Sequence, residues 1–268
     1  MSDPLDRAVI AAMRRAADEA IRPRFRHLAA GEIVHKAADD LVTVADRDAE
    51  AILFDDLARI LPEAALVGEE AAAADPALLD RLSDALCWVV DPLDGTNNFA
   101  AGRTPFGVMV ALAEAGETVA GWILDVMTGR VCSAHRGGGA FVDGERVRAR
   151  VTGDEPPIAA ISLVFADPAR RAALKAGIAP HYTLVDIPRC AAEQYPRLVL
   201  GTNDCALFER ALAWDHAPGV LFVNEAGGKV ARPDGSPYRV DQHGQRGLVG
   251  AASPALWEPL AARLTALD

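Results

Sequence analysis

The segment from residue 88 to 99, WVVDPLDGTNNF, constrains the fold of this 268-residue chain more than any other part. Its apolar start, WVV, predicts a buried strand, and the DPLDGT that follows predicts a turn. Pro92 fixes its own φ, and Gly95 allows backbone geometry that a larger residue would resist. The carboxylates of Asp91 and Asp94 are therefore expected to converge on one point where the strand ends.

This turn offers ligands for a cation and for a phosphate side by side. Hard cations such as Mg²⁺ prefer oxygen ligands, which carboxylates and a backbone carbonyl supply. The amide groups of Gly95, Thr96 and Asn97, at the start of the next segment, would be free to bind a phosphate. Asp-Pro and Asp-Gly are also common turn formers, so an isolated DPLDG would be an ordinary surface turn. The strand in front of it and two further acidic motifs favour the functional interpretation.

Charge and composition disfavour several classes of function. Acidic residues outnumber basic ones by 38 to 27, and the net charge of −11 disfavours nucleic acid and anionic membranes as partners. No apolar run approaches the roughly 20 residues of a membrane-spanning helix, and the start of the chain is unlike a secretory signal. The four cysteines are far apart and form no CxxC pair: Cys87, Cys132, Cys190 and Cys205. A reducing, cytoplasmic location is therefore expected.

Hydrophobic periodicity and turn residues predict alternating helices and strands along the chain. Helices are expected at 4–30, with Pro23 kinking or ending the first, at 47–60, after 168, at 191–200, at about 214–226 and from 254. Strands are expected at 65–67, 107–113, 119–126, 130–135, 139–142, 159–164, 182–185, 205–208, around 229 and at 248–251. The stretch 152–157, TGDEPP, is typical of a connector. It predicts lobes of residues 1–150 and 151–268 within one continuous domain.

Three acidic motifs lie at junctions between strands, loops and helices. They are GEE at 68–70, DPLDGT at 91–96 and WDHAPG at 214–219. Such junctions are where side chains from distant segments can meet at a sheet edge. Their four carboxylates are enough for two or three hard cations that share ligands: Glu69, Asp91, Asp94 and Asp215.

In order and spacing, these motifs resemble the signature motifs of the inositol monophosphatase family of lithium-sensitive, Mg²⁺-dependent phosphatases. The resembling segments are GEE, WVVDPLDGTNNF and WDHAPGVLFVNEAGG, with HKAADDLVTVAD near the start and the GGGAF hairpin at 137–141. The resemblance covers nearly the whole chain. It implies an α/β (α+β) fold, a layered α/β/α/β/α sandwich with mixed, largely antiparallel sheets, and commonly a homodimer.

The resemblance also implies how the acidic residues are used. Glu69, Asp91 and the backbone carbonyl of Leu93 would hold one Mg²⁺ ion. Asp91, Asp94 and Asp215 would hold a second, and Mn²⁺ is a possible substitute. Two or three ions are expected in all.

Other residues receive roles in catalysis and substrate binding from the same resemblance. Thr96, hydrogen-bonded toward Asp46, would orient the water that attacks phosphorus, and the amides of Gly95 and Thr96 would bind phosphate oxygens. Glu70 and Lys36 would lie close by, next to the metal ligands or the substrate. Considered singly, Lys36 is a solvated surface lysine and Asp46 is an N-cap of the following helix.

Two positions depart from the family pattern. Family members that bind inositol phosphates usually carry a Glu seven positions before the Asp of the WD motif. Here that position is Phe208, and Glu209 follows it. Arg189 and Cys190 stand where the family tends to have Gly-Thr or Gly-Ser, so that Arg189 either adds an anion contact or is simply exposed. Both departures concern the alcohol part of the substrate, so Glu209 and Arg189 are candidate substrate contacts.

The expected function is a Mg²⁺-dependent phosphomonoesterase that uses a metal-activated water and no covalent intermediate. The first candidate substrate is myo-inositol 1-phosphate, and the alternatives are histidinol phosphate, fructose 1,6-bisphosphate and 3′-phosphoadenosine 5′-phosphate. A rival from another class is a regulatory module that binds metal and phosphate without turnover. Such a module usually lacks a metal ligand or the threonine, and this chain has all of them.

Overall fold

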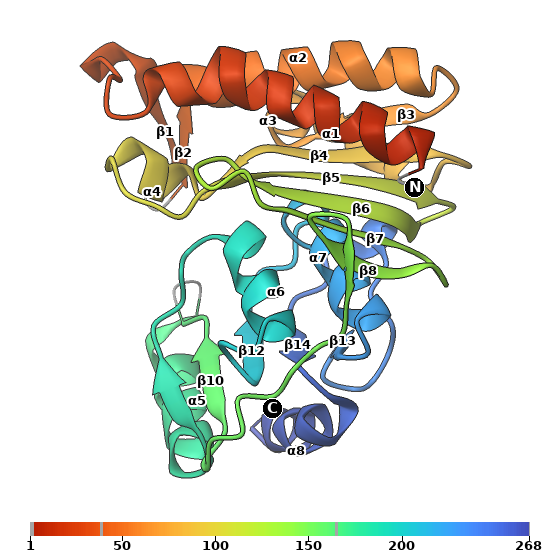
Figure 1. Ribbon diagram of the computed structural model, residues 1–268. Helices are drawn as coiled ribbons and strands as arrows, with labels where there is room; N and C mark the ends of the chain where they lie inside the picture. Colours follow the sequence, from red (N-terminus) through yellow and green to blue (C-terminus); the bar gives the residue numbers. More distant parts are fainter. Residues whose placement is uncertain (1–2, 38–39, 164–165, 268) are drawn as a thin grey trace.

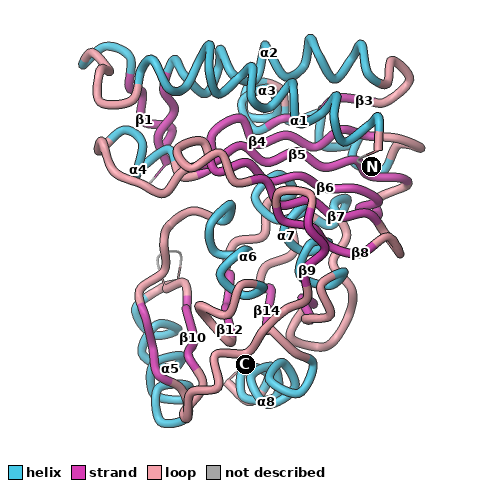
Figure 2. The backbone as a smooth tube through the Cα atoms, in the orientation of Figure 1, coloured by secondary structure: helices cyan, strands magenta, loops and turns pink. Residues whose placement is uncertain are grey.

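The computed structural model describes residues 3–37, 40–163 and 166–267. Its helices and sheets form successive layers, which Figures 1 and 2 show from one side. A helical layer covers a large sheet, two further helices lie beneath that sheet, and a smaller sheet and a last pair of helices complete the stack. The α/β/α/β/α sandwich implied by the sequence resemblance is thus confirmed. None of the described helices combines the length and the apolar character that crossing a membrane demands.

The outermost helical layer consists of α1 (Pro4–Ala16) and α2 (Val44–Ile60). The regular α-helix ends at Ala16, and helical turns of other kinds continue through η1 (Ala17–Ile21) and η2 (Arg22–Arg24). Pro23 lies in the last of these turns, so the helix expected at 4–30 ends earlier than predicted. Apolar side chains at helical spacing on both helices pack onto the upper face of the large sheet. Asp6 fixes the start of α1 to that sheet, because its Oδ1 accepts a hydrogen bond from Trp122 Nε1 at 2.8 Å.

The large sheet has seven strands in sequential order, and only the first pair is parallel. Its strands are β3 (Ala65–Gly68), β4 (Cys87–Asp94), β5 (Gly107–Glu114), β6 (Glu117–Asp125), β7 (Val131–His135), β8 (Gly139–Val142) and β9 (Glu145–Val147). Short helices follow two of them and a third precedes β4: α3 (Glu69–Ala74), α4 (Thr96–Ala100) and η4 (Pro76–Ser83). The strands β3 to β8 confirm predictions made from the sequence, whereas β9 was not predicted.

The smaller sheet has five strands in the order β11-β10-β12-β14-β13 and mixes parallel with antiparallel pairs. Its strands are β10 (Ile158–Ile161), β11 (Thr183–Val185), β12 (Cys205–Phe208), β13 (Lys229–Ala231) and β14 (Leu248–Ala251). The helices around it are α5 (Pro168–Ile178), η5 (Ala179–His181), α6 (Ala191–Val199), α7 (Ala213–Glu225), η6 (Val240–Gln242) and α8 (Pro254–Thr265). The division into lobes at residue 150 stays a prediction.

Two local expectations from the sequence were wrong. No strand was predicted between residues 30 and 43, but this region contains η3 (Ala30–Glu32) and the strand β1 (Ile33–Ala37), which pairs antiparallel with β2 (Asp40–Thr43). Residues 38–39 lie outside the described part. The DPLD stretch is also not a turn, because β4 continues to Asp94. Short polar runs give no periodicity from which such strands can be recognised.

The contact between α6 and α7 provides a test of the packing. Gly219 lies inside α7 against the ring of Tyr195 on α6, and a Cβ at this position would overlap that ring. Gly219→Ala is therefore expected to lower the free energy of unfolding by about 1–3 kcal/mol, although alanine favours an isolated helix. Gly244→Ala, where an added Cβ meets no atom within 4 Å, is the control. Equal urea midpoints for the two variants would contradict this packing.

Candidate active site

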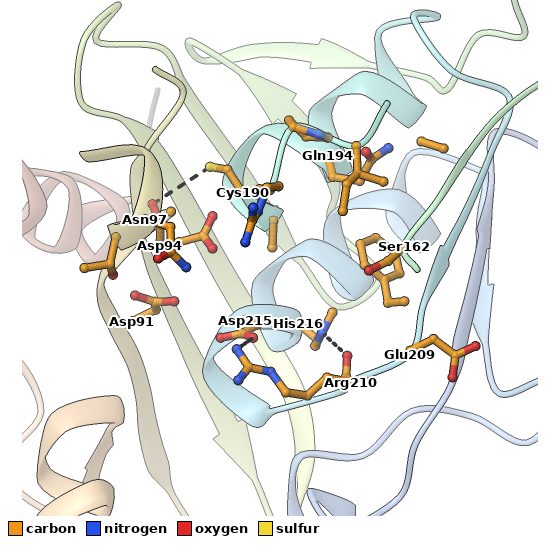
Figure 3. Close-up of a pocket in the computed structure, with 18 of the residues that line it drawn as sticks. Asp91, Asp94, Asn97, Ser162, Cys190, Gln194, Glu209, Arg210, Asp215 and His216 are labelled. Atoms are coloured by element: carbon orange, nitrogen blue, oxygen red, sulfur yellow. Dashed lines mark hydrogen bonds and ion pairs between the residues drawn. The ribbon is translucent and has the colours of Figure 1, made fainter. Parts of the chain in front are cut away.

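Three carboxylates from distant parts of the chain meet at one point. Glu69 begins α3, Asp91 lies on β4 and Asp215 lies in the first turn of α7. One oxygen atom of each lies within 4.8 Å of the others, a spacing from which all three can hold one metal ion. Figure 3 shows Asp91 and Asp215 facing the same space.

An irregularity in β4 directs the aspartates of the DPLDGT motif. Asp91 pairs with Met109 of β5 and Asp94 with Gly107, so three steps along β4 correspond to two along its partner. One extra residue on β4 is the signature of a β-bulge. In a regular strand, residues three apart point to opposite faces. The bulge removes that constraint, and both aspartates line the same pocket.

Asp94 does not belong to the group of three closely spaced carboxylates. Its Oδ2 accepts a hydrogen bond from the backbone amide of Ala192 at 2.7 Å, in the first turn of α6. Burial raises the pKa of Asp94, and the hydrogen bonds from this helix start act against the increase. Its expected part in holding a second cation stays a prediction.

Burial makes the acid cluster electrostatically unfavourable on its own. It raises the pKa of Asp91 well above the ordinary range, and the nearby carboxylates of Glu69, Asp94 and Asp215 raise it further. Glu69 and Asp215 sit at helix N-termini, where the backbone dipoles favour negative charge. The remaining repulsion would be relieved by a cation bound among these oxygens.

Thr96 and Asp46 form a hydrogen-bonded pair beside the cluster. Thr96 Oγ1 lies 3.0 Å from Asp46 Oδ1 and 2.9 Å from the carbonyl oxygen of Leu93, and its single proton can serve only one of them. Asp46 Oδ2 accepts hydrogen bonds from the amide and hydroxyl of Thr43, completing a capping box on α2. Burial raises the pKa of Asp46 to about 6, although the bonds from Thr43 and Thr96 act to lower it.

Glu50 supports the GEE motif in a way that the sequence analysis missed. Its carboxylate accepts hydrogen bonds from the amides of Glu70 and Ala71, both at 2.9 Å, and thereby caps α3. A Cβ on Gly68 would overlap this carboxylate, so the glycine of the motif is required for the approach. The available signal was the glycine itself, since close backbone approach is a common reason for one.

Arg210 is a second residue that the sequence analysis missed. Its Nη2 lies 3.5 Å from Asp215 Oδ2, so the cluster has a positive charge next to it. The carbonyl oxygen of Arg210 accepts a hydrogen bond from His216 Nε2 at 2.9 Å, and Tyr195 donates its hydroxyl proton to His216 Nδ1 at 2.6 Å. Burial lowers the pKa of His216 to about 3, so the ring is neutral. Its two hydrogen bonds then place the proton on Nε2.

A pocket of about 150 Å³ opens beside the acids and is lined by both expected substrate contacts, Arg189 and Glu209. Glu209 Oε1 lies 3.7 Å from Arg170 Nε on α5, and Figure 3 shows its carboxylate directed away from the aspartates. Lys36 is on β1, and its side chain lies outside the described part of the structure. The expected roles of all three in substrate binding stay predictions.

The residues present fit a hard divalent cation. The donor set is made of carboxylate oxygens, which Mg²⁺ and Mn²⁺ prefer. No histidine or cysteine joins this set among the described residues, which argues against zinc. Burial and the neighbouring carboxylates disfavour the charged form of Asp91, and a bound ion would stabilise that form.

Comparisons with known proteins agree with this geometry. The sequence profile of the Inositol monophosphatase family matches residues 1–267. An inositol-1-monophosphatase from Mycobacterium leprae is 36% identical over 233 residues, which cover 84% of this chain and 78% of that protein. The crystal structure of the extragenic suppressor protein SuhB from Bartonella henselae superimposes with a TM-score of 0.82, at 25% identity and 98% coverage of both chains.

The fold and the acid cluster therefore define a phosphoric monoester hydrolase of the metal-dependent class. The chain belongs to the inositol monophosphatase family. A more distant relative, the Nus factor SuhB of Vibrio cholerae, is 29% identical over 228 residues, or 83% of this chain and 82% of that protein.

Removing Asp91 tests the balance of charge in the cluster. In wild-type protein, MgCl₂ at about 100 times its dissociation constant is expected to raise the free energy of unfolding by roughly 2.7 kcal/mol. Tm should therefore rise by several degrees. Asp91→Asn keeps the size of the side chain and removes a buried charge, so Tm should rise without cation and no longer respond to it. Asp55→Asn, on the exposed side of α2, is the matched control. A normal Mg²⁺ response in Asp91→Asn would contradict the assignment.

Proposed function

We propose that this protein hydrolyses a small phosphorylated alcohol in a Mg²⁺-dependent reaction, with myo-inositol 1-phosphate as the first substrate to test. The observation that carries the proposal is the group of three carboxylates within 4.8 Å of one another beside a pocket. The name of the relative from Mycobacterium leprae supports the choice of substrate.

Glu69, Asp91 and the carbonyl of Leu93 would hold one Mg²⁺ ion. Asp91, Asp94 and Asp215 would hold a second. When bound, the cations neutralise phosphate oxygens, make water more acidic and stabilise the departing alkoxide. No covalent intermediate with the protein is then needed. Inhibition by Li⁺ and replacement of Mg²⁺ by Mn²⁺ stay predictions of this proposal.

Thr96 and Asp46 would orient the attacking water and accept its proton. The water donates to Thr96 Oγ1, and the hydroxyl proton of Thr96 passes to Asp46 Oδ1, 3.0 Å away. The pKa of Asp46, about 6, suits a group that accepts a proton near neutral pH. Glu70 is close enough to raise that pKa and would help to hold the proton.

The phosphate would be bound by the amides of Gly95 and Thr96 and by Lys36. Gly95 has a φ of 85°, which sends the chain directly from β4 into α4. Arg189 also adopts a positive φ, 53°, and would contact an anionic or hydroxyl group of the substrate together with Glu209.

The alternative substrates share the same chemistry. A panel of myo-inositol 1-phosphate, histidinol phosphate, fructose 1,6-bisphosphate and 3′-phosphoadenosine 5′-phosphate, with released phosphate as the readout, would distinguish them. The compound with the highest kcat/KM identifies the alcohol that the pocket accepts.

A role without catalysis is the second candidate, favoured by the relative that is named a Nus factor. A module that only binds would not need a hydroxyl between a carboxylate and a carbonyl, as Thr96 has. Mg²⁺ binding by calorimetry, without hydrolysis of any phosphate in the panel, would favour this candidate instead.

Assembly and location are the last parts of the proposal. A homodimer is proposed from the family resemblance, and size-exclusion chromatography with light scattering tests it. The four cysteines are buried and free, which is compatible with the proposed cytoplasmic location.

A pair of variants at Thr96 tests the proton path. Thr96→Val keeps the shape and removes the hydroxyl, and kcat is expected to fall by about 100-fold or more, since positioned proton transfer typically contributes that much. Thr96→Ser keeps the hydroxyl and should retain most of the activity. The measurement is phosphate release at saturating substrate and Mg²⁺. Similar activity in the two variants would contradict the proposed path, because only Thr96→Ser keeps the hydroxyl.

A further inference from the structure

Gln194 has a feature that neither the fold nor the proposed chemistry explains. It lies in α6, lines the pocket and is only 3% exposed. Within residues 3–37, 40–163 and 166–267, neither its Nε2 nor its Oε1 has a hydrogen-bond partner. It is the only described residue whose amide nitrogen and oxygen are both buried without one.

Such an amide is unfavourable for folding. A buried amide that has lost its hydrogen bonds to water destabilises the native state, whereas an apolar side chain of the same length would not. α6 is otherwise amphipathic, and its neighbouring buried residue Tyr195 does have a partner, His216. A native structure keeps an unsatisfied polar group for a reason, and position beside a pocket points to a ligand.

The surroundings of Gln194 suit the alcohol end of a substrate. Apolar residues contribute to the lining of this pocket, among them Ala160, Ile187 and Leu207. In Figure 3, Gln194 and Ser162 lie on the opposite side of the view from Asp91 and Asp94. A few polar groups in an apolar wall are the usual means by which a pocket orients a small molecule.

We propose that Gln194 is a specificity-determining residue that hydrogen-bonds a hydroxyl of the leaving alcohol. A hydroxyl both donates and accepts, so it can pair with the oxygen and the nitrogen of the amide. The two amide atoms are shielded when the pocket is empty, so the side chain turns about its own bonds as the alcohol enters. The preferred substrate is then a phosphate of a polyhydroxylated alcohol. The inference rests on the proposed function.

The test compares two substrates that differ in the leaving group. Myo-inositol 1-phosphate carries several hydroxyls, and p-nitrophenyl phosphate carries none. Gln194→Met keeps the length of the side chain and removes both hydrogen-bonding atoms. The ratio of kcat/KM for the inositol phosphate to that for p-nitrophenyl phosphate is expected to fall about 10- to 100-fold, the effect of one or two hydrogen bonds. Tm should not fall, because an unsatisfied amide has been replaced.

Two further variants complete the experiment. Gln194→Asn keeps the amide but shortens the side chain by one methylene, so the ratio of the two kcat/KM values should fall here too. This variant provides the test if the methionine variant does not fold. Gln245→Met, at an exposed position outside the pocket, should leave the ratio as in wild type.

The outcomes separate the possible explanations. An unchanged ratio in both Gln194 variants overturns the inference. A lower Tm with equal losses on both substrates also overturns it, because the amide would then be satisfied by buried water and be structural. If the wild-type protein hydrolyses neither substrate while it still binds Mg²⁺, the proposed function itself fails, and the inference fails with it.

Discussion

Repulsion between the buried carboxylate of Asp91 and its half-buried neighbours is the constraint on which the site depends. Glu69, Asp91 and Asp215 would separate if their backbone were free to move, because the charges of Glu69 and Asp215 raise the pKa of Asp91. Each is instead fixed to a different rigid element, the start of α3, the bulged end of β4 and the first turn of α7. The fold thus keeps like charges together at a cost in free energy of folding, and a divalent cation would offset part of that cost on binding.

The hydrogen bonds around the cluster show how this position is maintained. Glu50 caps α3 behind Glu69, and Ala192 at the start of α6 donates its amide to Asp94. On the far side, Tyr195 and His216 fix the backbone of Arg210, whose side chain stands next to Asp215. These contacts come from segments far apart in the sequence, so the site forms only when both sheets and the helices between them are packed. Helix α7 packs against strands of both sheets and connects them.

The sequence was sufficient for the elements whose signal is local. Apolar periodicity predicted α2 and the strands of the large sheet from β3 to β8, but not β9. Of the four carboxylates that the acidic motifs predicted to meet, three lie close together: Glu69, Asp91 and Asp215. It was insufficient where geometry depends on a partner. The β-bulge at Asp91 exists only in relation to β5, and Glu50 is one of several acids on α2 until Gly68 is seen to admit it. Gln194 is likewise an ordinary polar residue of a helix until the fold buries it. The short hairpin of β1 and β2 lacked an apolar pattern and was missed for that reason.

The arrangement of the pocket separates the chemistry from the choice of substrate. Glu69, Asp91, Asp94 and Thr96 all belong to the large sheet and the short helices that follow its strands. The side of the pocket proposed for the alcohol is lined by segments of the smaller sheet and its connections, at residues 160–162, 187–194 and 207–210. Of the proposed metal ligands, only Asp215, in α7, lies outside the large sheet and the short helices that follow its strands. Phe208, Arg189 and Gln194 lie in these segments. The same segments also contain Ala192 and Arg210, which contact Asp94 and Asp215, so the two parts of the pocket are coupled through these residues.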